Sequence, residues 1–361
     1  MYYKKDGRSS FFIIFFCRIL KLRVFGAYNI TERLRVKNFS LQKLLWVLYF
    51  VLIICPNLFS RGAAMPEKKY ITLVNGETIA YIEQGEEKKD AGETFLLIHG
   101  NASSSMHFLP LFRNMKNVHI LAPDLRGFGD SSYNSGFSTL LELAEDVKLF
   151  AGALGIQKAH IVGWSNGGGI AMELAVKYPE FVSTLFLIQG AGYKGFPLFK
   201  KKPDGTYAPF ASKEDLANDP LLIKPALAAL ESKNAMHFNL SWNAAIYVNK
   251  KPSIKDNKIY IGETLKQRNL VDLDWALIHF NMSDQHNGYS QGTNTIGQIN
   301  CPTALTCAEL DKIVPPGTVR ENAAAIKGSK LIEYKKSGHS PLVDCPEQLA
   351  ADILSHAGTG Q

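Results

Sequence analysis

From residue 70 onward, short apolar runs alternate along the chain with longer amphipathic segments. Four of these runs predict strands that are buried on both faces, at residues 94–99, 118–123, 160–163 and 182–188. Between them, residues 140–154 and 168–177 place apolar side chains at helical spacing. Strands that alternate with helices form parallel units in a doubly wound sheet, so we expect an α/β fold.

Two regions modify this pattern. Residues 70–74 and 78–83 flank Asn75-Gly76, a dipeptide typical of hairpin turns. After Gly190 the alternation stops, and three helical stretches follow without a convincing strand, at residues 221–231, 235–248 and 260–280.

The α/β pattern resumes at Cys301, with expected strands at 303–307 and 330–334 and a closing helix at 346–356. The simplest organisation is a core built from residues 65–190 and 298–361. Residues 191–297 then form a mostly helical cap that is inserted after the sixth strand.

Residues 1–64 form a basic, hydrophobic N-terminal segment. They contain 11 Lys and Arg against 2 Asp and Glu, a net charge of +9, whereas the other residues carry 29 against 31, a net of −2. The overall charge of +7 therefore belongs to this segment, and the rest of the chain has no charge-based case for binding nucleic acid.

The N-terminal segment has two interpretations. The apolar run at 44–55 is shorter than the ~20 residues of a membrane-spanning helix, but its basic and small flanks fit a signal peptide or signal-anchor. The protein would then be membrane-anchored or exported through residues 40–60 and could contact a membrane. Alternatively, translation starts at Met65, where a soluble-domain composition begins, and the protein is cytoplasmic.

The sequence Gly163-Trp164-Ser165-Asn166-Gly167 lies between an expected strand and an expected helix. A serine on such a tight turn is held in a strained conformation that presents its hydroxyl above the sheet. The helix start behind it adds a positive partial charge and free backbone N–H groups. We therefore identify Ser165 as the candidate nucleophile.

A serine hydroxyl needs a base, and the base needs an acid that orients it. Asp311 follows the strand at 303–307 and His339 follows the strand at 330–334, so both fall at the carboxyl edge of the sheet. The order Ser165, Asp311, His339 is the one expected for this topology. Glu309 and Asp284 are rival acids.

The backbone N–H groups of Asn101 and Asn166 are candidates for an oxyanion hole, because both follow buried strands at the same edge. Five side chains are candidates for the substrate pocket: Trp164, Met106, Trp242, Trp275 and His286. The five cysteines have no metal-ligand spacing, and we expect neither a metal nor an organic cofactor.

Five motifs in order resemble the α/β-hydrolase fold superfamily: HGN at 99–101, DLRGFGDS at 124–131, GWSNGG at 163–168, Asp311, and SGHSP at 337–341. The resemblance implies a catalytic triad of Ser165, Asp311 and His339, an oxyanion hole at Asn101 and Asn166, and a helical cap. The serine at the nucleophile position disfavours the dehalogenases and epoxide hydrolases, which carry aspartate there.

Within that superfamily, the chain most resembles the intracellular short-chain-length polyhydroxyalkanoate (poly-3-hydroxybutyrate) depolymerases. Four segments of the cap carry this resemblance, together with SGHSPLVDCP at 337–346: GFPLFKKKPDG at 195–205, SKEDLANDP at 212–220, RNLVDLDWAL at 268–277 and DQHNG at 284–288. It implies a cytoplasmic esterase that acts on 3-hydroxybutyrate polymer or oligomers, whereas residues 1–64 depart from the family pattern.

The sequence thus predicts a serine hydrolase of carboxylic esters, with a small-molecule ester or a polyester as substrate. A carbon–carbon bond hydrolase or a perhydrolase would use the same three residues. A non-catalytic binding protein of this fold is the alternative from another class, although such proteins commonly lack one of the three.

Overall fold

The computed structural model describes residues 66–91 and 94–359. The basic N-terminal segment, residues 1–64, and its candidate membrane segment at 40–60 lie outside the described residues. Within the described part of the chain, no helix is both long and apolar enough to cross a bilayer.

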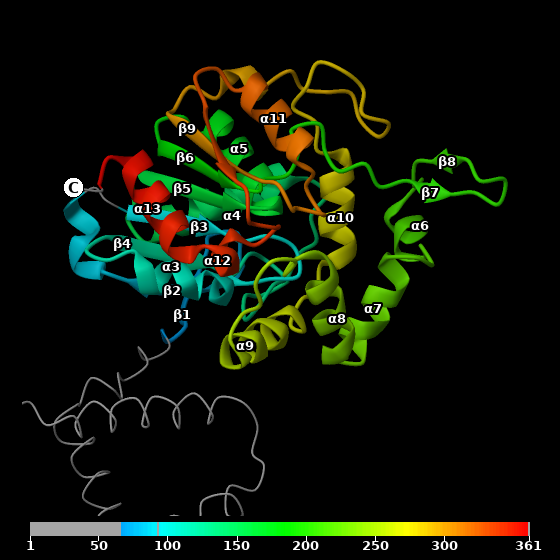
Figure 1. The fold of residues 1–361 in the computed structure, drawn as a ribbon, viewed down its shortest axis with the longest axis horizontal. Coiled ribbons are helices and arrows are strands. Elements are labelled where there is room, and N and C mark those ends of the chain that lie inside the picture. The colour runs from blue at the N-terminus through cyan, green and yellow to red at the C-terminus, as the bar shows by residue number, and fades with distance from the viewer. Residues whose placement is uncertain (1–65, 92–93, 360–361) are drawn as a thin grey trace, which may run out of the picture. The chain divides into compact units, whose positions relative to one another are not determined.

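Eight strands form the central sheet in the order β1-β2-β4-β3-β5-β6-β9-β10 (Figure 1). Their bounds are β1 Lys69–Thr72, β2 Thr78–Gln84, β3 Thr94–Ile98, β4 His119–Pro123, β5 Ala159–Trp164, β6 Val182–Ile188, β9 Thr303–Ala308 and β10 Lys330–Tyr334. β2 is antiparallel to both of its neighbours, β1 and β4, and the remaining pairs are parallel. The expected α/β fold with a mostly parallel sheet is confirmed.

Helices cover both faces of this sheet. The core helices are α3 Leu109–Asn114, α4 Leu140–Ala153, α5 Asn166–Lys177, α11 Pro316–Ala325, α12 Pro341–Asp344 and α13 Pro346–Ala357, with 3-10 turns at Glu86–Ala91, Ser105–Phe108 and Ile296–Gln298. Alternate side chains of β3 enter different cores: Leu96 and Ile98 pack in the core that contains α4 and α5, and Phe95 and Leu97 in the core that contains α3 and α13. Double burial explains why these strands are apolar at nearly every position.

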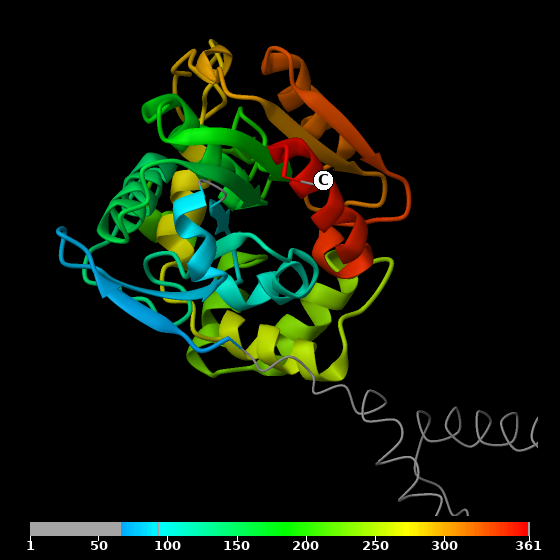
Figure 2. The ribbon, with the colours of Figure 1, turned by 90° about the vertical axis from the view of Figure 1, so that its left-hand side faces the viewer.

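The hairpin expected at Asn75-Gly76 joins β1 and β2 at the edge of the sheet, and Figure 2 shows it in blue. Gly76 has a φ of 87°, a conformation that suits glycine at such a turn. The short hairpin formed by β7 (Lys200–Lys201) and β8 (Tyr207–Ala208) was not expected from the sequence, because two-residue lysine-rich strands carry no hydrophobic pattern.

Five helices follow between β6 and β9: α6 Lys213–Ala217, α7 Ile223–Glu231, α8 Ala235–Ala245, α9 Ile254–Thr264 and α10 Leu270–His279. They occupy the stretch expected to form the cap, and α7 to α10 lie beyond one end of the strands (Figure 1). The helical stretch expected at 260–280 is divided in the structure between the end of α9 and α10, because the chain breaks between them. In that break Arg268 donates its backbone N–H to Gly127 and Asn269 donates its side-chain amide to Arg126, so bonds to the core replace helical ones.

Ion pairs fasten the cap to the core. Arg113 of α3 contacts both carboxylate oxygens of Asp256 in α9, at 2.8 and 2.6 Å. Asp124, Asp130 and Glu263 also converge, with ligand atoms within 4.8 Å of one another. The Lys68 ammonium lies between these carboxylates, at 2.8, 2.6 and 2.7 Å, and fills the position that a cation would take.

Candidate active site

Ser165 lies on the turn between β5 and α5. Its φ of 56° and ψ of −122° are strained for a residue with a side chain, at a cost of about 1–3 kcal/mol. The turn is tight because its glycines allow a close approach: a Cβ on Gly167 would lie 2.1 Å from the carbonyl oxygen of Ile98. The sequence therefore folds into a turn that holds the hydroxyl in one place.

His339 and Asp311 complete a chain of hydrogen bonds with this serine. The Nε2 atom of His339 lies 2.9 Å from Ser165 Oγ, and its Nδ1 atom lies 2.8 Å from Asp311 Oδ2. All three side chains are buried, with exposed fractions of 9% or less. The structure thus brings together the three predicted residues, from three separate loops.

Neighbouring groups fix both partners of the serine. The second carboxylate oxygen of Asp311 accepts the backbone N–H groups of Ile313 and Val314, at 2.7 and 2.9 Å. Trp164 donates its indole N–H to the His339 carbonyl oxygen at 2.8 Å. Because a carboxylate only accepts, His339 donates from Nδ1 to Asp311 and is left with Nε2 free to accept the proton of Ser165.

The two rival acids are placed elsewhere. Glu309 and Asp284 are both exposed, and neither shares a hydrogen bond with His339 within the described residues. Asp311 is the acid that the geometry selects.

The backbone N–H groups of Asn101 and Asn166 both lie beside Ser165. Neither has an acceptor among the described residues, as is expected of donors that are kept for a substrate oxygen. A Cβ on Gly100 would lie 2.8 Å from the Ser165 Cβ, so this loop runs directly past the nucleophile. The placement fits the predicted oxyanion hole.

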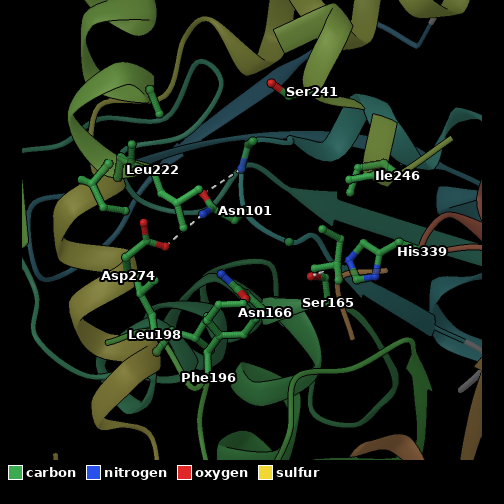
Figure 3. A pocket seen from close by; sticks show the side chains of 18 of the residues that line it. Asn101, Ser165, Asn166, Phe196, Leu198, Leu222, Ser241, Ile246, Asp274 and His339 are labelled. Atoms are coloured by element: carbon green, nitrogen blue, oxygen red, sulfur yellow. Dashed lines mark hydrogen bonds between the residues drawn. The ribbon is translucent and has the colours of Figure 1, made fainter. Parts of the chain in front are cut away.

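A cavity of about 490 Å³ opens in front of these groups, between the core and the cap (Figure 3). Its walls are largely apolar and come from the connection after β6, from α7, α8 and α10, and from the Asp311 loop: Phe196, Leu198, Leu222, Ile223, Ala226, Phe238, Trp242, Ile246, Leu270, Leu277, Ile278, Ile313 and Val314. Trp164 and Trp242 line this cavity as expected.

Three other predicted pocket residues do not line the cavity. Met106 is buried in the core of α3 and α13. Trp275 is one position beyond Asp274 on α10, which turns it by about 100° toward a separate small cluster, where its ring lies 4.1 Å from that of His279. His286 lines a second cavity of about 260 Å³. These residue types are common in substrate pockets, but the helix faces and loops that carry these three direct their side chains away from the cavity.

Sequence reasoning missed Asp274, which lies on α10 and lines the cavity. Burial raises the pKa of this carboxyl from its ordinary value of 3.8 to about 7. The available signal was a second aspartate within the apolar stretch LVDLDWALIH. Its neighbour Asp272 is explained by structure, because it accepts hydrogen bonds from Tyr133 and Lys213.

Comparisons with known proteins agree with this architecture. A family profile described as alpha/beta hydrolase fold matches residues 93–346. Lipase 1 of Psychrobacter immobilis is 26% identical over 296 residues, which cover 81% of this chain and 84% of that protein. A 2-hydroxymuconate semialdehyde hydrolase of Pseudomonas putida is 38% identical over 115 residues, 30% of this chain and 41% of that one.

Solved structures add a likeness in fold. An esterase from Exiguobacterium antarcticum superposes with a TM-score of 0.62 at 18% identity, covering 81% of this chain and 100% of that chain.

Proposed function

The chain belongs to the alpha/beta hydrolase fold family, and from this premise we propose that it is a serine hydrolase of carboxylic esters. The observation that carries the proposal is the hydrogen-bonded chain from Ser165 through His339 to Asp311 at the floor of an apolar cavity. The similarity to a named lipase over most of the chain supports the choice of ester substrates.

In the proposed reaction, Ser165 Oγ attacks the ester carbonyl carbon and His339 Nε2 accepts the hydroxyl proton. The Asn101 and Asn166 backbone N–H groups stabilise the negative oxygen that forms. As the C–O bond to the alcohol breaks, His339 returns the proton to the leaving oxygen and an acyl-serine remains.

Water then attacks the acyl-serine, and His339 takes the proton of that water. The tetrahedral intermediate collapses, the acid is released, and Ser165 regains its proton. Throughout, Asp311 keeps the imidazole in the required tautomer and stabilises its charged form.

For the substrate, we propose 3-hydroxybutyrate oligomers or polyester. Two of the cap segments that resemble the depolymerases supply cavity walls, namely Phe196 and Leu198 in one and Leu270 and Leu277 in the other. A cavity of about 490 Å³ lies in the size range of pockets for drug-sized ligands, so it has room for an oligomer of more than one 3-hydroxybutyrate unit. The same resemblance leads us to propose a cytoplasmic enzyme.

A carbon–carbon bond hydrolase is the second candidate, favoured by the local similarity to the semialdehyde hydrolase. A panel of p-nitrophenyl butyrate, 3-hydroxybutyrate oligomers and a vinylogous diketone separates the two, with products identified by mass spectrometry. We expect ester and oligomer cleavage by the wild type and none by Ser165→Ala. Cleavage of the diketone alone would refute the ester assignment.

A fluorophosphonate probe should label the wild type and spare Ser165→Ala. An unlabelled wild type that turns over no substrate would instead favour a binding protein.

A further inference from the structure

The cavity contains one carboxyl group, that of Asp274, among largely apolar walls. One of its oxygens, Oδ1, accepts a hydrogen bond from the side-chain amide of Asn101 at 3.1 Å. The other oxygen has no hydrogen-bond partner among the residues that the structure describes. Asp274 is half-buried and lines the cavity, so this oxygen can accept a hydrogen bond from a ligand that enters there.

Asn101 is not free to turn toward the second oxygen. Its own side-chain oxygen accepts hydrogen bonds from Gln267 Nε2 and from the backbone N–H of Ala102, both at 2.8 Å. These contacts fix the amide, so Asp274 keeps one oxygen available to the cavity.

Asn166 supplies a group of the opposite kind. It follows the nucleophile directly, it lines the same cavity, and it is only 5% exposed. Its side-chain nitrogen is buried without an acceptor in the described part of the chain. The polar groups at this place therefore include an unpaired donor and an unpaired acceptor.

A hydroxyl group can satisfy both, since it donates one hydrogen bond while it accepts another. Its position along the substrate follows from the scaffold. Asn101 and Asn166 offer their backbone N–H groups to the carbonyl oxygen, so their side chains reach only atoms a few bonds away from that carbonyl.

The hydroxyl belongs on the acyl part of the ester. In the view of Figure 3, Asp274 and Asn101 lie on one side of Ser165 and His339 lies on the other. The leaving alcohol takes its proton from His339, so the side that faces Asp274 is left to the acyl chain.

We propose that Asp274 and Asn166 form a hydroxyl-binding subsite, through which the enzyme selects 3-hydroxyacyl esters over plain acyl esters of the same length. This inference rests on the proposed ester hydrolysis and assigns its acyl specificity to two residues. Asp274 is the specificity-determining residue that can be changed without altering an oxyanion donor.

The test compares kcat/KM for p-nitrophenyl 3-hydroxybutyrate, in its faster enantiomer, with kcat/KM for p-nitrophenyl butyrate, using the full chain. We expect the wild type to prefer the hydroxyacyl ester about 10- to 100-fold, the range for a hydrogen bond to a charged group. Asp274→Leu should bring this ratio close to one. Asp274→Asn, which keeps an acceptor for Asn101, should lower it several-fold.

Asp284→Asn is the matched control, because it removes the same charge from an exposed position outside the cavity, and it should keep the wild-type ratio. A wild-type ratio near one overturns the inference, whether or not Asp274→Leu folds. Equal losses on both esters in the Asp274 variants also overturn it, since they would mean that Asp274 merely positions Asn101. If no ester is hydrolysed and Ser165 is not labelled, the proposed function itself fails.

Discussion

Replacing Asp311 with asparagine tests the hydrogen-bonded chain with almost no change in shape. In the wild type, one carboxylate oxygen accepts two backbone N–H groups, at 2.7 and 2.9 Å, and the other accepts the Nδ1 proton of His339 at 2.8 Å. The backbone pair demands an acceptor, so in Asp311→Asn the amide oxygen takes that place and the amide nitrogen faces His339.

Two donors would then meet unless the imidazole changes its tautomer. With Nδ1 as the acceptor, Nε2 carries the proton and points it at Ser165 Oγ, 2.9 Å away, where a base is needed. The variant also loses the negative charge that stabilises the imidazolium. Together these effects should lower kcat about 10⁴-fold, or about 5.5 kcal/mol of transition-state stabilisation.

The assay is the initial rate of p-nitrophenyl butyrate hydrolysis near pH 7.5, with thermal unfolding of each variant as the check on folding. Asp284→Asn, the rival acid, is the control and should retain the wild-type rate. An Asp311→Asn enzyme within tenfold of the wild type would refute the assignment of Asp311. A large loss in Asp284→Asn would transfer the assignment to that residue.

The remaining predictions concern stability. Gly167→Ala should lower the free energy of unfolding by about 3 kcal/mol or more, because the new Cβ would lie 2.1 Å from a backbone carbonyl oxygen. Gly262→Ala in α9 should instead raise it by about 0.5–1 kcal/mol, because the new Cβ meets nothing within 4 Å. Urea denaturation of the two variants measures both changes. Asp274 has a raised folded-state pKa of about 7 against 3.8, so its carboxyl binds more protons in the folded state and costs stability increasingly as the pH rises from about 4 to 7. Asp274→Asn should therefore have the same free energy of unfolding as the wild type near pH 4 and a higher one above pH 7, by about 1–2 kcal/mol once water in the cavity is allowed for. A gain in stability that does not depend on pH would contradict this prediction. Lys68→Met should lower the free energy of unfolding by about 1–3 kcal/mol in urea denaturation at low salt, because the buried Asp124 loses its cation while Lys266 still pairs with Asp130 and Glu263. An unchanged midpoint would show that the Lys68 contacts do not stabilise the fold.

Much of the core could be predicted because its signals are local. Strand β6 occupies the residues that the apolar run at 182–188 indicated, and α5 begins beside the Gly-rich turn. A strand that is buried on both faces is apolar at nearly every position, and a tight turn is marked by its glycines. Both signals are carried by residues that are neighbours in the sequence. The cap was harder, because its break at Gln267–Asn269 is stabilised by bonds to distant core residues rather than by local helical ones.

The candidate site divides in the same way. Ser165, Asp311 and His339 could be identified because each follows a strand that the sequence reveals, and parallel strands bring their ends to one edge. The pocket could not, because a tryptophan or methionine has the same local signal in a core as in a cavity wall. Trp242 lines the cavity, whereas Trp275 turns away on α10, and Met106 is buried in the core.

The sequence by itself determined the order of the core elements, the strained turn at the nucleophile, and Ser165 and His339 as nucleophile and base, whereas the choice of Asp311 over Glu309 and Asp284 came from the geometry. Only the tertiary structure decided which cap side chains face Ser165, and that Asp274 lies in an apolar cavity with one oxygen unpaired. The physical reason is that periodicity records how a segment is buried. It does not record which distant segment covers it, and the chemistry of a pocket is set by that partner.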